Sequence, residues 1–505
     1  MRVRRARTFG LTCALALAVT MGVSGCVGQS ASAGEPAGTA RFYDQKLTWK
    51  PCDGAFECAA VTVPEDWSKP GGATIHVGLT KAAALSGQPK GTIIFNPGGP
   101  GLPASASTRA PTFGLDAEIA SGYDVVGYDP PGVGRATPVN CGPGADLGKE
   151  LFEPNPHPVD SAAWVSAYTK AGREFAQRCI KDSARGLLNH VDTVSAARDL
   201  DVVRAALGQK RLDYLGYSYG TDLGLVYEAL FPAHIGRVVL DGVKDPLADP
   251  VETSVAVAGA YEKDLDDYLS ACGSRPDCPF SGSLDQMHAT LQSFLSGLDA
   301  HPLSTSSGFE LDGSWATSGI LDALLSQSAF TTELLELDND LGEAMDGAGD
   351  GLLTLAEDSV SWTPADTGDS LYAPNLAINC ADRWLPTTAS TMSAEAAKLT
   401  AAAPVLGPYL SYDGTSCTGF PTAPKRFTEK STPRPANTVL IVSATGDPAT
   451  PNSDALAVHA RMANSRLLIR DGDGHTSYGD GNTCIDNAVD GYLEKGTLPK
   501  DNTHC

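Results

Sequence analysis

The feature that most constrains this chain is a Gly-x-Ser-x-Gly motif at residues 216–220, which lies between a strand pattern and a helix pattern. The apolar run 212–215 predicts a strand that ends at the motif, and residues 222–231 predict a helix that begins just after it. A serine on such a strand-to-helix turn has a strained backbone, and glycine on both sides avoids collisions with neighbouring chain. The sequence therefore predicts that Ser218 is a nucleophile on the turn between a strand and a helix.

A nucleophilic serine needs a general base, and the base needs an acid that orients it. Among the nine histidines, His475 is favoured because it ends a glycine-rich loop, 471–475, that follows an apolar strand pattern. Asp447 lies in the loop after the preceding strand pattern at 439–442. The chain order serine, aspartate, histidine, with acid and base after successive strands, is that of the α/β-hydrolase fold. Asp241, which follows another apolar strand pattern, is the competing candidate for the acid.

A second glycine-rich loop is expected to stabilise the negative charge that develops at the reacting carbonyl. Residues 96–101 read Asn-Pro-Gly-Gly-Pro-Gly and follow the strand pattern at 92–95. In this fold, that loop donates one backbone N–H to the oxyanion, and the residue after the nucleophile donates the other. Gly99 and Tyr219 are therefore the expected oxyanion donors. A phosphate-binding loop is the alternative, but the Gly-Lys-Ser/Thr sequence is missing and the prolines lack N–H donors.

The alternation of strand and helix patterns predicts an α/β protein with a mostly parallel central sheet. We expect the first part of an α/β-hydrolase core at residues 45–247, and its C-terminal part, with the acid and base loops, at residues 431–505. Residues 248–430 show helical periodicity, for example at 255–271 and 320–341, and few strand patterns. We therefore expect a largely helical cap inserted into the core.

The N-terminus has the pattern of an exported bacterial lipoprotein. Several arginines precede the apolar stretch 10–21, which is too short to span a bilayer as a helix. Residues 23–26 read Val-Ser-Gly-Cys, the form of a lipobox, so we expect a signal peptide at residues 1–25 and a lipid on Cys26. Residues 26–44 are small and polar and are expected to form a flexible tether. The protein is thus expected to be exported, and either anchored to the cell membrane by lipid alone or secreted.

The cysteines are expected to be paired in the mature protein. Of the 12 cysteines, Cys13 lies in the expected leader and Cys26 is the expected lipid carrier, so an even number is left in a chain sent to an oxidising compartment. The sequence alone allows many pairings. Local spacing favours Cys52–Cys58, Cys141–Cys179, Cys272–Cys278, Cys380–Cys417 and Cys484–Cys505.

The charge of the chain argues against nucleic-acid partners, and its motifs argue against a cofactor. There are 37 Lys and Arg against 60 Asp and Glu, a formal net charge of −23, and such a field repels phosphate. The segment from Asp346 to Glu357 mimics a calcium-binding EF-hand loop, but Ala348 occupies a position that needs a ligand, so a loop between cap helices is expected instead. Zinc spacing and a dinucleotide fingerprint are both missing from the sequence, so we expect no metal and no cofactor.

Taken together, these motifs resemble the secreted tripeptidyl aminopeptidases, which are α/β-hydrolases allied to proline iminopeptidase. The resemblance runs from about Trp49 to the C-terminus, and it is most specific at Ile-x-Cys-x-Asp (378–382) and Asp-Pro-x-Thr-Pro (447–451). It implies a serine exopeptidase that uses the serine, aspartate and histidine described above as its catalytic triad. It also implies peptide substrates with a free N-terminus, from which dipeptides or tripeptides are released.

An aminopeptidase must hold the charged α-amino group of its substrate at a fixed distance from the serine, and a carboxylate in the cap is the natural ligand. Asp382, at the end of the Ile-x-Cys-x-Asp segment, is the leading candidate, with Glu262 and Asp264 as competitors. The same triad under a different cap would make a carboxylesterase or lipid-ester hydrolase. A catalytically silent binding protein on this scaffold is a further alternative, against which the complete triad argues.

Overall fold

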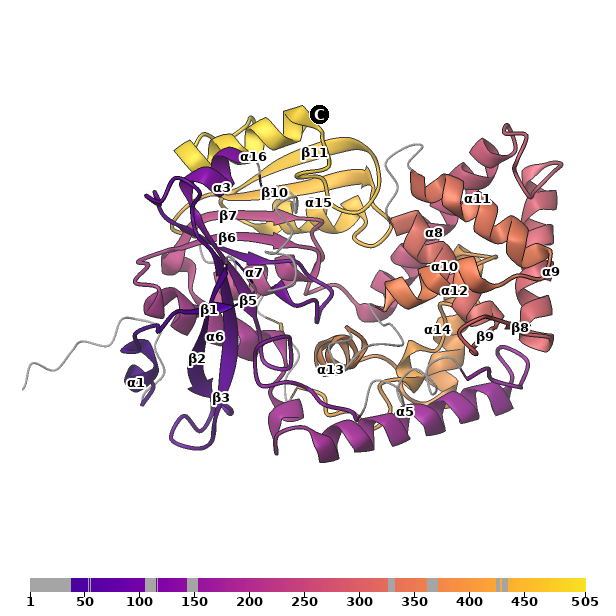
Figure 1. Ribbon diagram of the computed structural model, residues 1–505, viewed down its shortest axis with the longest axis horizontal. Helices are drawn as coiled ribbons and strands as arrows, with labels where there is room; N and C mark the ends of the chain where they lie inside the picture. The colour runs from indigo at the N-terminus through magenta and orange to yellow at the C-terminus, as the bar shows by residue number, and fades with distance from the viewer. Residues whose placement is uncertain are drawn as a thin grey trace, which may run out of the picture.

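The computed structural model describes residues 38–505 except 53, 55, 105–114, 116, 143–152, 326–331, 361–370, 424–426 and 429–434. The expected signal peptide, the lipid-carrying Cys26 and most of the expected tether lie outside the described residues. The described chain forms an α/β core and a helical cap that lie side by side (Figure 1).

The core is built on one large sheet. In the described part of the chain it has ten strands in the order β1-β2-β3-β5-β4-β6-β7-β10-β11-β12. The strands are β1 (Lys50–Cys52), β2 (Phe56–Pro64), β3 (Thr74–Ala82), β4 (Thr92–Asn96), β5 (Asp124–Asp129), β6 (Leu212–Tyr217), β7 (Ile235–Asp241), β10 (Val439–Gly446), β11 (Ser465–Asp473) and β12 (Thr503–His504). The strands from β5 to β12 pair in parallel, whereas β1, β2, β3 and β5 pair antiparallel. This is the mostly parallel sheet of the α/β-hydrolase fold that the sequence predicts.

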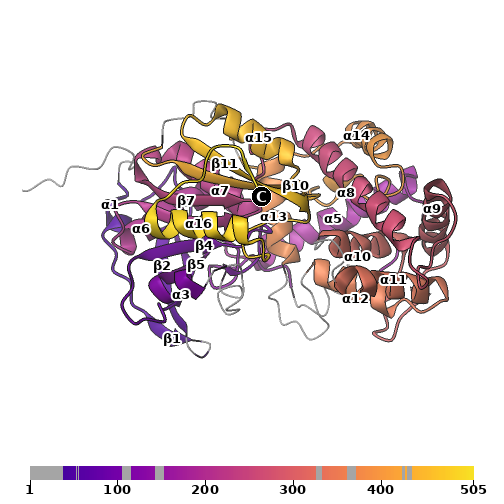
Figure 2. The same cartoon turned by 90° about the horizontal axis from the view of Figure 1, so that it is seen from above.

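Helices cover both faces of the sheet because alternate strand residues point to opposite sides. Ile94 and Val126 pack toward α6 (Thr193–Ala206), α7 (Tyr219–Leu230) and α15 (Asn452–Arg461). Their neighbours Ile93 and Val125 pack on the other face, toward α3 (Ala117–Gly122) and α16 (Thr483–Lys495). Figure 1 shows α3 and α16 above the sheet and α6 and α7 below it, and Figure 2, seen from above, shows α16 lying across the strands. The strands are apolar on both faces for this reason, as buried parallel strands are.

The cap is almost entirely helical. Its elements after β7 are α8 (Pro250–Cys272), α9 (Leu284–Ala300), β8 (Leu303–Ser304), β9 (Glu310–Leu311), α10 (Gly313–Leu325), α11 (Thr332–Met345), α12 (Asp350–Ser359), α13 (Tyr372–Arg383), α14 (Ala389–Ala402) and the short 3₁₀ helix η3 (Asp413–Thr415). Figure 1 shows α13 between the sheet and the other cap helices. The helical periodicity expected over 320–341 is divided between α10 and α11.

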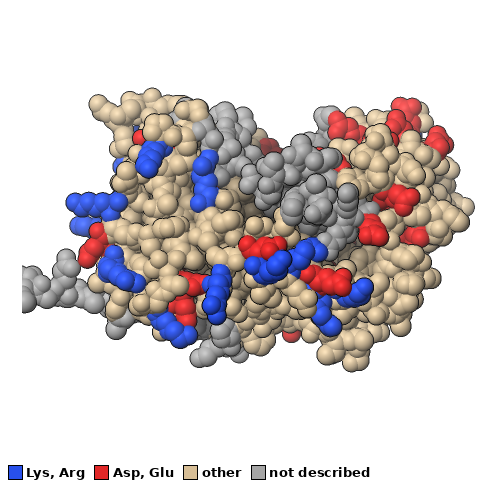
Figure 3. Space-filling view, turned by 60° about the horizontal axis from the view of Figure 1, so that its bottom comes forward, with Lys and Arg blue, Asp and Glu red and all other residues tan. Residues whose placement is uncertain are grey.

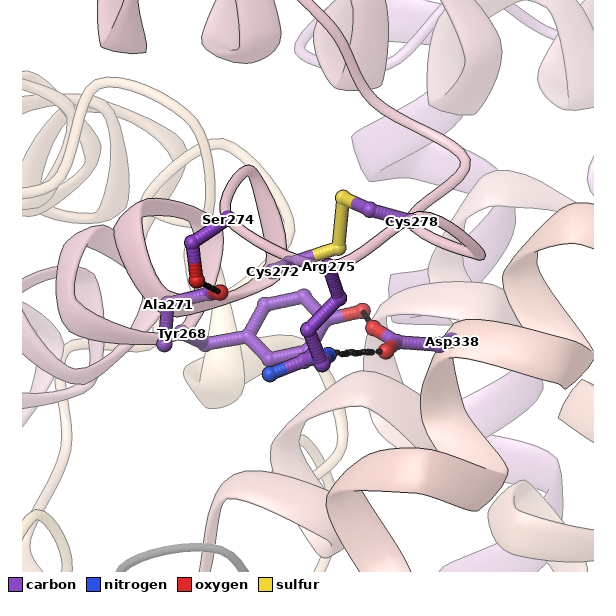
Figure 4. The surroundings of a disulfide bond; sticks show 7 residues. All are labelled: Tyr268, Ala271, Cys272, Ser274, Arg275, Cys278 and Asp338. Atoms are coloured by element: carbon purple, nitrogen blue, oxygen red, sulfur yellow. Dashed lines mark hydrogen bonds and ion pairs between the residues drawn. A yellow bond between two sulfur atoms is a disulfide. The ribbon is translucent and has the colours of Figure 1, made fainter.

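A buried carboxylate ties α8 to α11 inside the cap (Figure 4). Asp338, only 4% exposed, accepts hydrogen bonds from Tyr268 Oη at 2.7 Å and from Arg275 Nε at 2.8 Å. Arg275 lies in the turn that follows α8, and the Cys272–Cys278 disulfide closes this turn. The pairing with Arg275 and Tyr268 satisfies a charge that is expensive to bury alone.

Helix α5 (Ala162–Asp182) belongs to the cap, although it precedes α6 in the chain and falls within the range 45–247 expected to be core. Trp164 near its start packs with Met392 of α14 and edge-to-face with Tyr412. Figure 1 shows α5 running along the cap. The expected boundary was therefore too simple: the apolar face of α5 finds its partners on cap helices, which periodicity along the chain does not reveal.

The folded domain also begins earlier than residue 45. Within the range expected to be tether, residues Ala40–Tyr43 form the short helix α1. Phe42 is 3% exposed and belongs to the main apolar core. An aromatic side chain that gains this much burial holds the end of the tether against the core.

Five disulfides link the described cysteines, and they are the pairs that local spacing favours: Cys52–Cys58, Cys141–Cys179, Cys272–Cys278, Cys380–Cys417 and Cys484–Cys505. Two short 3₁₀ helices complete the core, η1 (Leu187–Asn189) and η2 (Pro232–His234).

In the described residues, no helix has the length and apolarity needed to cross a membrane. On the face in Figure 3, acidic side chains gather at the cap end, and Lys and Arg lie toward the middle and the core end.

Candidate active site

Ser218 lies on a tight turn between β6 and α7, and its backbone is strained. Its φ of 53° and ψ of −121° are rare for a residue with a side chain. A Cβ on Gly216 would come within 2.5 Å of the Gly220 carbonyl oxygen, and one on Gly220 within 2.6 Å of the Asn96 carbonyl oxygen. Both glycines of the motif are therefore required for the turn, which leaves Ser218 partly exposed at the carboxyl end of the sheet.

Asp447 and His475 meet at the carboxyl ends of two adjacent parallel strands. Asp447 directly follows β10, and His475 follows β11, whose Asp473 is in register with Gly446. His475 Nδ1 lies 3.0 and 2.9 Å from the two carboxylate oxygens of Asp447. The carboxylate accepts this N–H, which fixes the imidazole tautomer and leaves Nε2 without a proton, as a general base requires.

The electrostatics of this pair favour charge on both partners. Burial alone would raise the pKa of Asp447, but the charge and hydrogen bond of His475 and the hydrogen bonds from Thr450 outweigh burial and lower that pKa. Thr450 donates to Asp447 from its backbone N at 2.8 Å and from its Oγ1 at 2.7 Å. Burial alone would lower the pKa of His475, but the charge and hydrogen bond of Asp447, with the charge of Asp241, raise it. Asp447 thus stabilises the protonated imidazolium that forms during proton transfer.

Asp241, the competing candidate for the acid, has a different set of partners. Its Oδ2 accepts the backbone N–H groups of Ser477 at 3.0 Å and Tyr478 at 2.7 Å, just after the histidine. Burial raises the pKa of Asp241 to about 6, although these two hydrogen bonds oppose the rise. Asp241 therefore holds the loop that carries His475 and does not contact its ring by a hydrogen bond.

Ser218 and His475 each lie next to the end of β7. The Ser218 amide donates to the Asp241 carbonyl oxygen at 2.9 Å, and a Cβ on the next residue, Gly242, would lie 3.2 Å from His475 Cε1. Within the described chain, the Ser218 hydroxyl and His475 make no hydrogen bond to each other. Such bonds are often long before substrate binds and tighten in the complex.

The glycine-rich loop after β4 lies directly against the nucleophile. Gly98 has a φ of +102°, and a Cβ on it would come within 2.6 Å of the Tyr217 carbonyl oxygen and 2.9 Å of Ser218 Cβ. Gly99 and Tyr219 line the same cavity as Ser218. The Tyr219 N–H is at the first position of α7, where an amide has no partner inside the helix. Both residues thus lie in the cavity with the nucleophile, and the oxyanion role of their amides stays a prediction.

We call the space above Ser218 the active-site cavity. Its volume is about 230 Å³. In addition to Gly99, Ser218 and Tyr219, the core contributes Lys244 and Thr450 to its lining. The cap contributes residues of α8 and α14, Asn379 and Arg383 of α13, and Asp413 of η3. A cavity formed jointly by core and cap is the usual place for a substrate site in this architecture.

Asp382, Glu262 and Asp264, the candidate ligands for an α-amino group, are not among the residues that line the active-site cavity. Asp382 accepts hydrogen bonds from the Thr193 N at 3.1 Å and its Oγ1 at 2.7 Å, and it lines a neighbouring cavity. Burial and nearby Asp192 raise the pKa of Asp382 to about 7. Glu262 accepts the backbone N–H groups of residues 405 and 406 within the cap. Asp264 is buried, which raises its pKa to about 7.

Asp413 is the carboxylate that lines the active-site cavity, and sequence reasoning did not find it. Its side chain is 49% exposed, and its ion-pair partner is Arg383 Nη1 at 3.8 Å. Asp413 belongs to no recognisable motif. It lines the same cavity as Ser218 because η3 packs against α13 and α5. Thr450 was not singled out either, although it belongs to the Asp-Pro-x-Thr-Pro segment.

One acidic cluster and the EF-hand-like segment were compared with the requirements of a cation site. Carboxylate oxygens of Asp264, Asp267 and Asp473 lie within 4.8 Å of one another. Lys263 Nζ already reaches this cluster, at 2.6 Å from Asp267 and 3.9 Å from Asp264, and supplies positive charge. In the EF-hand-like segment, residues from Asp350 onward form helix α12, so they do not form a calcium-binding loop.

The sheet, the cap and the elbow define an α/β-hydrolase. Residues 403–505, which include Asp447 and His475, match the family described as TAP-like protein. Serine protease Hip1 of Mycobacterium tuberculosis is 30% identical over 100% of this chain and 99% of its own. Tripeptidyl aminopeptidase of Streptomyces lividans is 31% identical over 94% of this chain and 89% of its own. Carboxylesterase B of Mycobacterium tuberculosis is 33% identical over 89% of this chain and 86% of its own.

The chain therefore belongs to the α/β-hydrolase family that contains Hip1 and the tripeptidyl aminopeptidases. This is the family that the sequence motifs resemble. Its relatives carry the names of peptidases and of an esterase, so membership defines a hydrolase and leaves the bond that it cleaves to the chemistry of the site.

Proposed function

We propose that this protein is an exported serine hydrolase that releases dipeptides or tripeptides from the free N-terminus of peptides. The observation that carries the proposal is the hydrogen-bonded pair of His475 and Asp447 at the end of β10 and β11, beside the turn that presents Ser218. A serine, a base with a fixed tautomer and two oxyanion donors are the parts that acyl transfer needs.

The reaction begins when the Ser218 Oγ attacks the carbonyl carbon of the scissile peptide bond. His475 Nε2 takes the hydroxyl proton, and the carbonyl oxygen becomes an oxyanion that accepts the N–H groups of Gly99 and Tyr219. The C–N bond then breaks, and His475 returns the proton to the leaving amine. Water, deprotonated by the same Nε2, attacks the acyl carbon. The bond from that carbon to Ser218 Oγ then breaks, His475 returns the proton to Oγ, and the short peptide leaves. Asp447 keeps its charge throughout and stabilises the imidazolium.

Cleavage from the N-terminus needs an anchor for the α-ammonium group. We assign this role to Asp413, because it combines a partly exposed carboxylate with a place in the lining of the active-site cavity. Asp382, the candidate favoured by the sequence, is occupied by Thr193 in the neighbouring cavity. The cap over Ser218 also supports an exopeptidase, since a cavity of about 230 Å³ has room for the end of a chain.

An ester hydrolase is the second candidate, and one observation favours it. The relative named Carboxylesterase B is 33% identical to this chain. The same serine, base and oxyanion donors cleave an ester when the leaving group is an alcohol, and an ester hydrolase needs no ligand for an ammonium group.

A substrate panel distinguishes the two candidates. Tripeptide amides with a free amine, the same amides with a blocked amine, and short and long acyl esters are compared by kcat/KM. The peptidase proposal predicts cleavage of the free-amine amides and a large loss on blocking. Cleavage of esters alone, or indifference to blocking, contradicts it.

Two variants assign the activity to the site. Ser218→Ala is expected to lower kcat by about a million-fold, because the members of a triad act as a unit. Ser274→Ala, at an exposed turn after α8, is the matched control and is expected to keep full activity. A Ser218→Ala protein that keeps its activity and its labelling by a fluorophosphonate would sink the assignment.

A further inference from the structure

One face of α13 lines two cavities in succession. Asn379 and Arg383 line the active-site cavity, and Tyr372 and Leu376, earlier in the helix, line a second cavity. These four positions lie on one side of the helix, because residues three or four apart are neighbours on a helix surface. Asp413 lines both cavities, so the two adjoin at this residue.

The second cavity, which we call the aromatic cavity, has a volume of about 240 Å³. Seven of its sixteen lining residues are aromatic and come from α5, α10, α13 and the segment before η3, and five others are serine or threonine. The aromatic residues are Trp164, Tyr168, Phe175, Trp315, Tyr372, Tyr409 and Tyr412. Apart from Asp413 at the junction, the described residues of its lining carry no charge.

The walls of the aromatic cavity are held in place by packing. Trp164 contacts Tyr168 edge-to-face with ring centroids 4.5 Å apart, and Tyr412 on its other side at 5.6 Å. Tyr409 Oη donates a hydrogen bond to Asp299 at 2.9 Å. A cavity with fixed aromatic walls binds a ring or a large apolar side chain with a low cost in side-chain entropy.

The proposed substrate is shorter than α13. From Tyr372 to Arg383 the helix extends about 16 Å at about 1.5 Å per residue. Three extended residues cover about 10 Å. A tripeptide whose third carbonyl lies at Ser218 therefore extends about 10 Å from the nucleophile. Asp413 lines the same cavity as Ser218 and is the carboxylate available there to its first residue.

We propose that the aromatic cavity is the subsite for the side chain of the N-terminal residue of the substrate, and that it selects peptides that begin with an aromatic or other large apolar residue. Asp413 at the junction binds the α-ammonium group of the same residue. This inference rests on the proposed aminopeptidase function and adds the class of substrate. It follows from the junction of the two cavities, because the ammonium and side chain of one residue are attached to the same carbon.

The experiment compares free-amine tripeptide amides that carry Phe at the first, second or third position and Ala elsewhere. We expect kcat/KM to rise by at least about tenfold when Phe replaces Ala at the first position, as a well-filled apolar pocket discriminates. Phe at the second or third position should give a smaller gain.

Two variants change the cavity in opposite ways. Trp315→Ala removes part of a wall, and Ser318→Trp on the same helix fills the space. Each should reduce the preference for Phe over Ala at the first position to less than about threefold. Trp49→Leu, beside Lys81 in the core, is the matched control and should keep the wild-type preference. Thermal unfolding establishes that each variant is folded.

The outcomes separate this inference from the proposed function. If the wild type cleaves the all-Ala tripeptide amide but shows no gain with Phe at the first position, the subsite assignment is wrong and the aminopeptidase function stands. A gain only with Phe beside the scissile bond has the same meaning. If a fluorophosphonate labels Ser218 but no tripeptide amide is cleaved, the aminopeptidase function itself is wrong.

Discussion

At the scale of single residues, the site depends on one carboxylate that stays charged although it is buried. Asp447 is 2% exposed, a position where an isolated carboxylate would take up a proton. Backbone N–H groups of residues 449 and 450, the Thr450 hydroxyl and His475 all donate to it. Two of these donors are backbone groups fixed by the turn after β10, so the charge is stabilised before substrate arrives.

This environment predicts the pH dependence of the reaction. The base acts as neutral imidazole, and the charge of Asp447 raises the pKa of His475 above its ordinary value of 6.5. We therefore expect kcat/KM to fall as pH decreases through this raised pKa, with an acid limb that lies above pH 6.5. A pH profile of kcat/KM measures it. An acid limb well below this value would contradict the assigned pair.

A pair of variants distinguishes the two candidate acids. Asp447→Asn removes the charge and the acceptor that fix the imidazole, so kcat should fall by about ten-thousand-fold and the acid limb should move to lower pH. Asp241→Asn keeps an acceptor oxygen for the amides of Ser477 and Tyr478 and should cost less than about tenfold. Steady-state kinetics of both proteins check the prediction. Equal losses would mean that Asp241 shares the role of Asp447.

At the scale of elements, the loop after β4 has no room for a side chain where it meets the nucleophile. Gly98→Ala combines a φ of +102° with a collision at the Tyr217 carbonyl oxygen, so the loop must move. We expect kcat to fall by about a hundred-fold or more, the loss seen when one oxyanion donor is removed. Gly87→Ala, with a φ of +69° and open space around it, is the control for backbone strain alone and should keep its activity.

The cap helices should depend on their buried ion pair. Asp338→Ala leaves Tyr268 and Arg275 without their acceptor inside the cap, and we expect a loss of about 3–5 kcal/mol in the free energy of unfolding. Asp267→Ala removes an exposed pair with Lys263 on the same helix, α8, and should cost less than about 1 kcal/mol. Denaturant unfolding measures both. Similar values for the two variants would show that the buried pair does not hold α8 to α11.

Local pattern predicted most of the sheet and the order of its functional loops. The runs at 92–95, 212–215 and 439–442 are strands β4, β6 and β10, because parallel strands buried on both faces are continuously apolar. The turns that carry Ser218 and Asp447 directly follow β6 and β10, and His475 follows β11. Helix α5 and Asp413 could not be predicted in the same way, because their places depend on contacts with elements more than 200 residues away in the chain.

At the scale of the whole molecule, the disulfides and the N-terminal sequence both favour an exported protein. The five described disulfides need an oxidising compartment to form and persist. The proposed lipid on Cys26 would hold the enzyme at the membrane, because acyl chains gain free energy for each CH₂ group that they bury in the bilayer.

The anchor can be tested in cells. Cys26→Ala should abolish the incorporation of labelled palmitate and move the protein from the membrane fraction. Cys13→Ala, in the expected leader, is the control and should leave both unchanged. Wild-type protein that takes up no label would contradict lipidation.

The cap is assembled from two separate stretches of chain. Helix α5 enters it before the nucleophile is reached, and α8 to α14 enter it afterwards, with the Cys141–Cys179 and Cys380–Cys417 disulfides closing one stretch each. The aromatic cavity has walls from both. A chimaera that exchanges substrate specificity between two such enzymes must therefore transplant both stretches together, because replacing only the longer insertion would leave the α5 wall of the aromatic cavity from the parent enzyme.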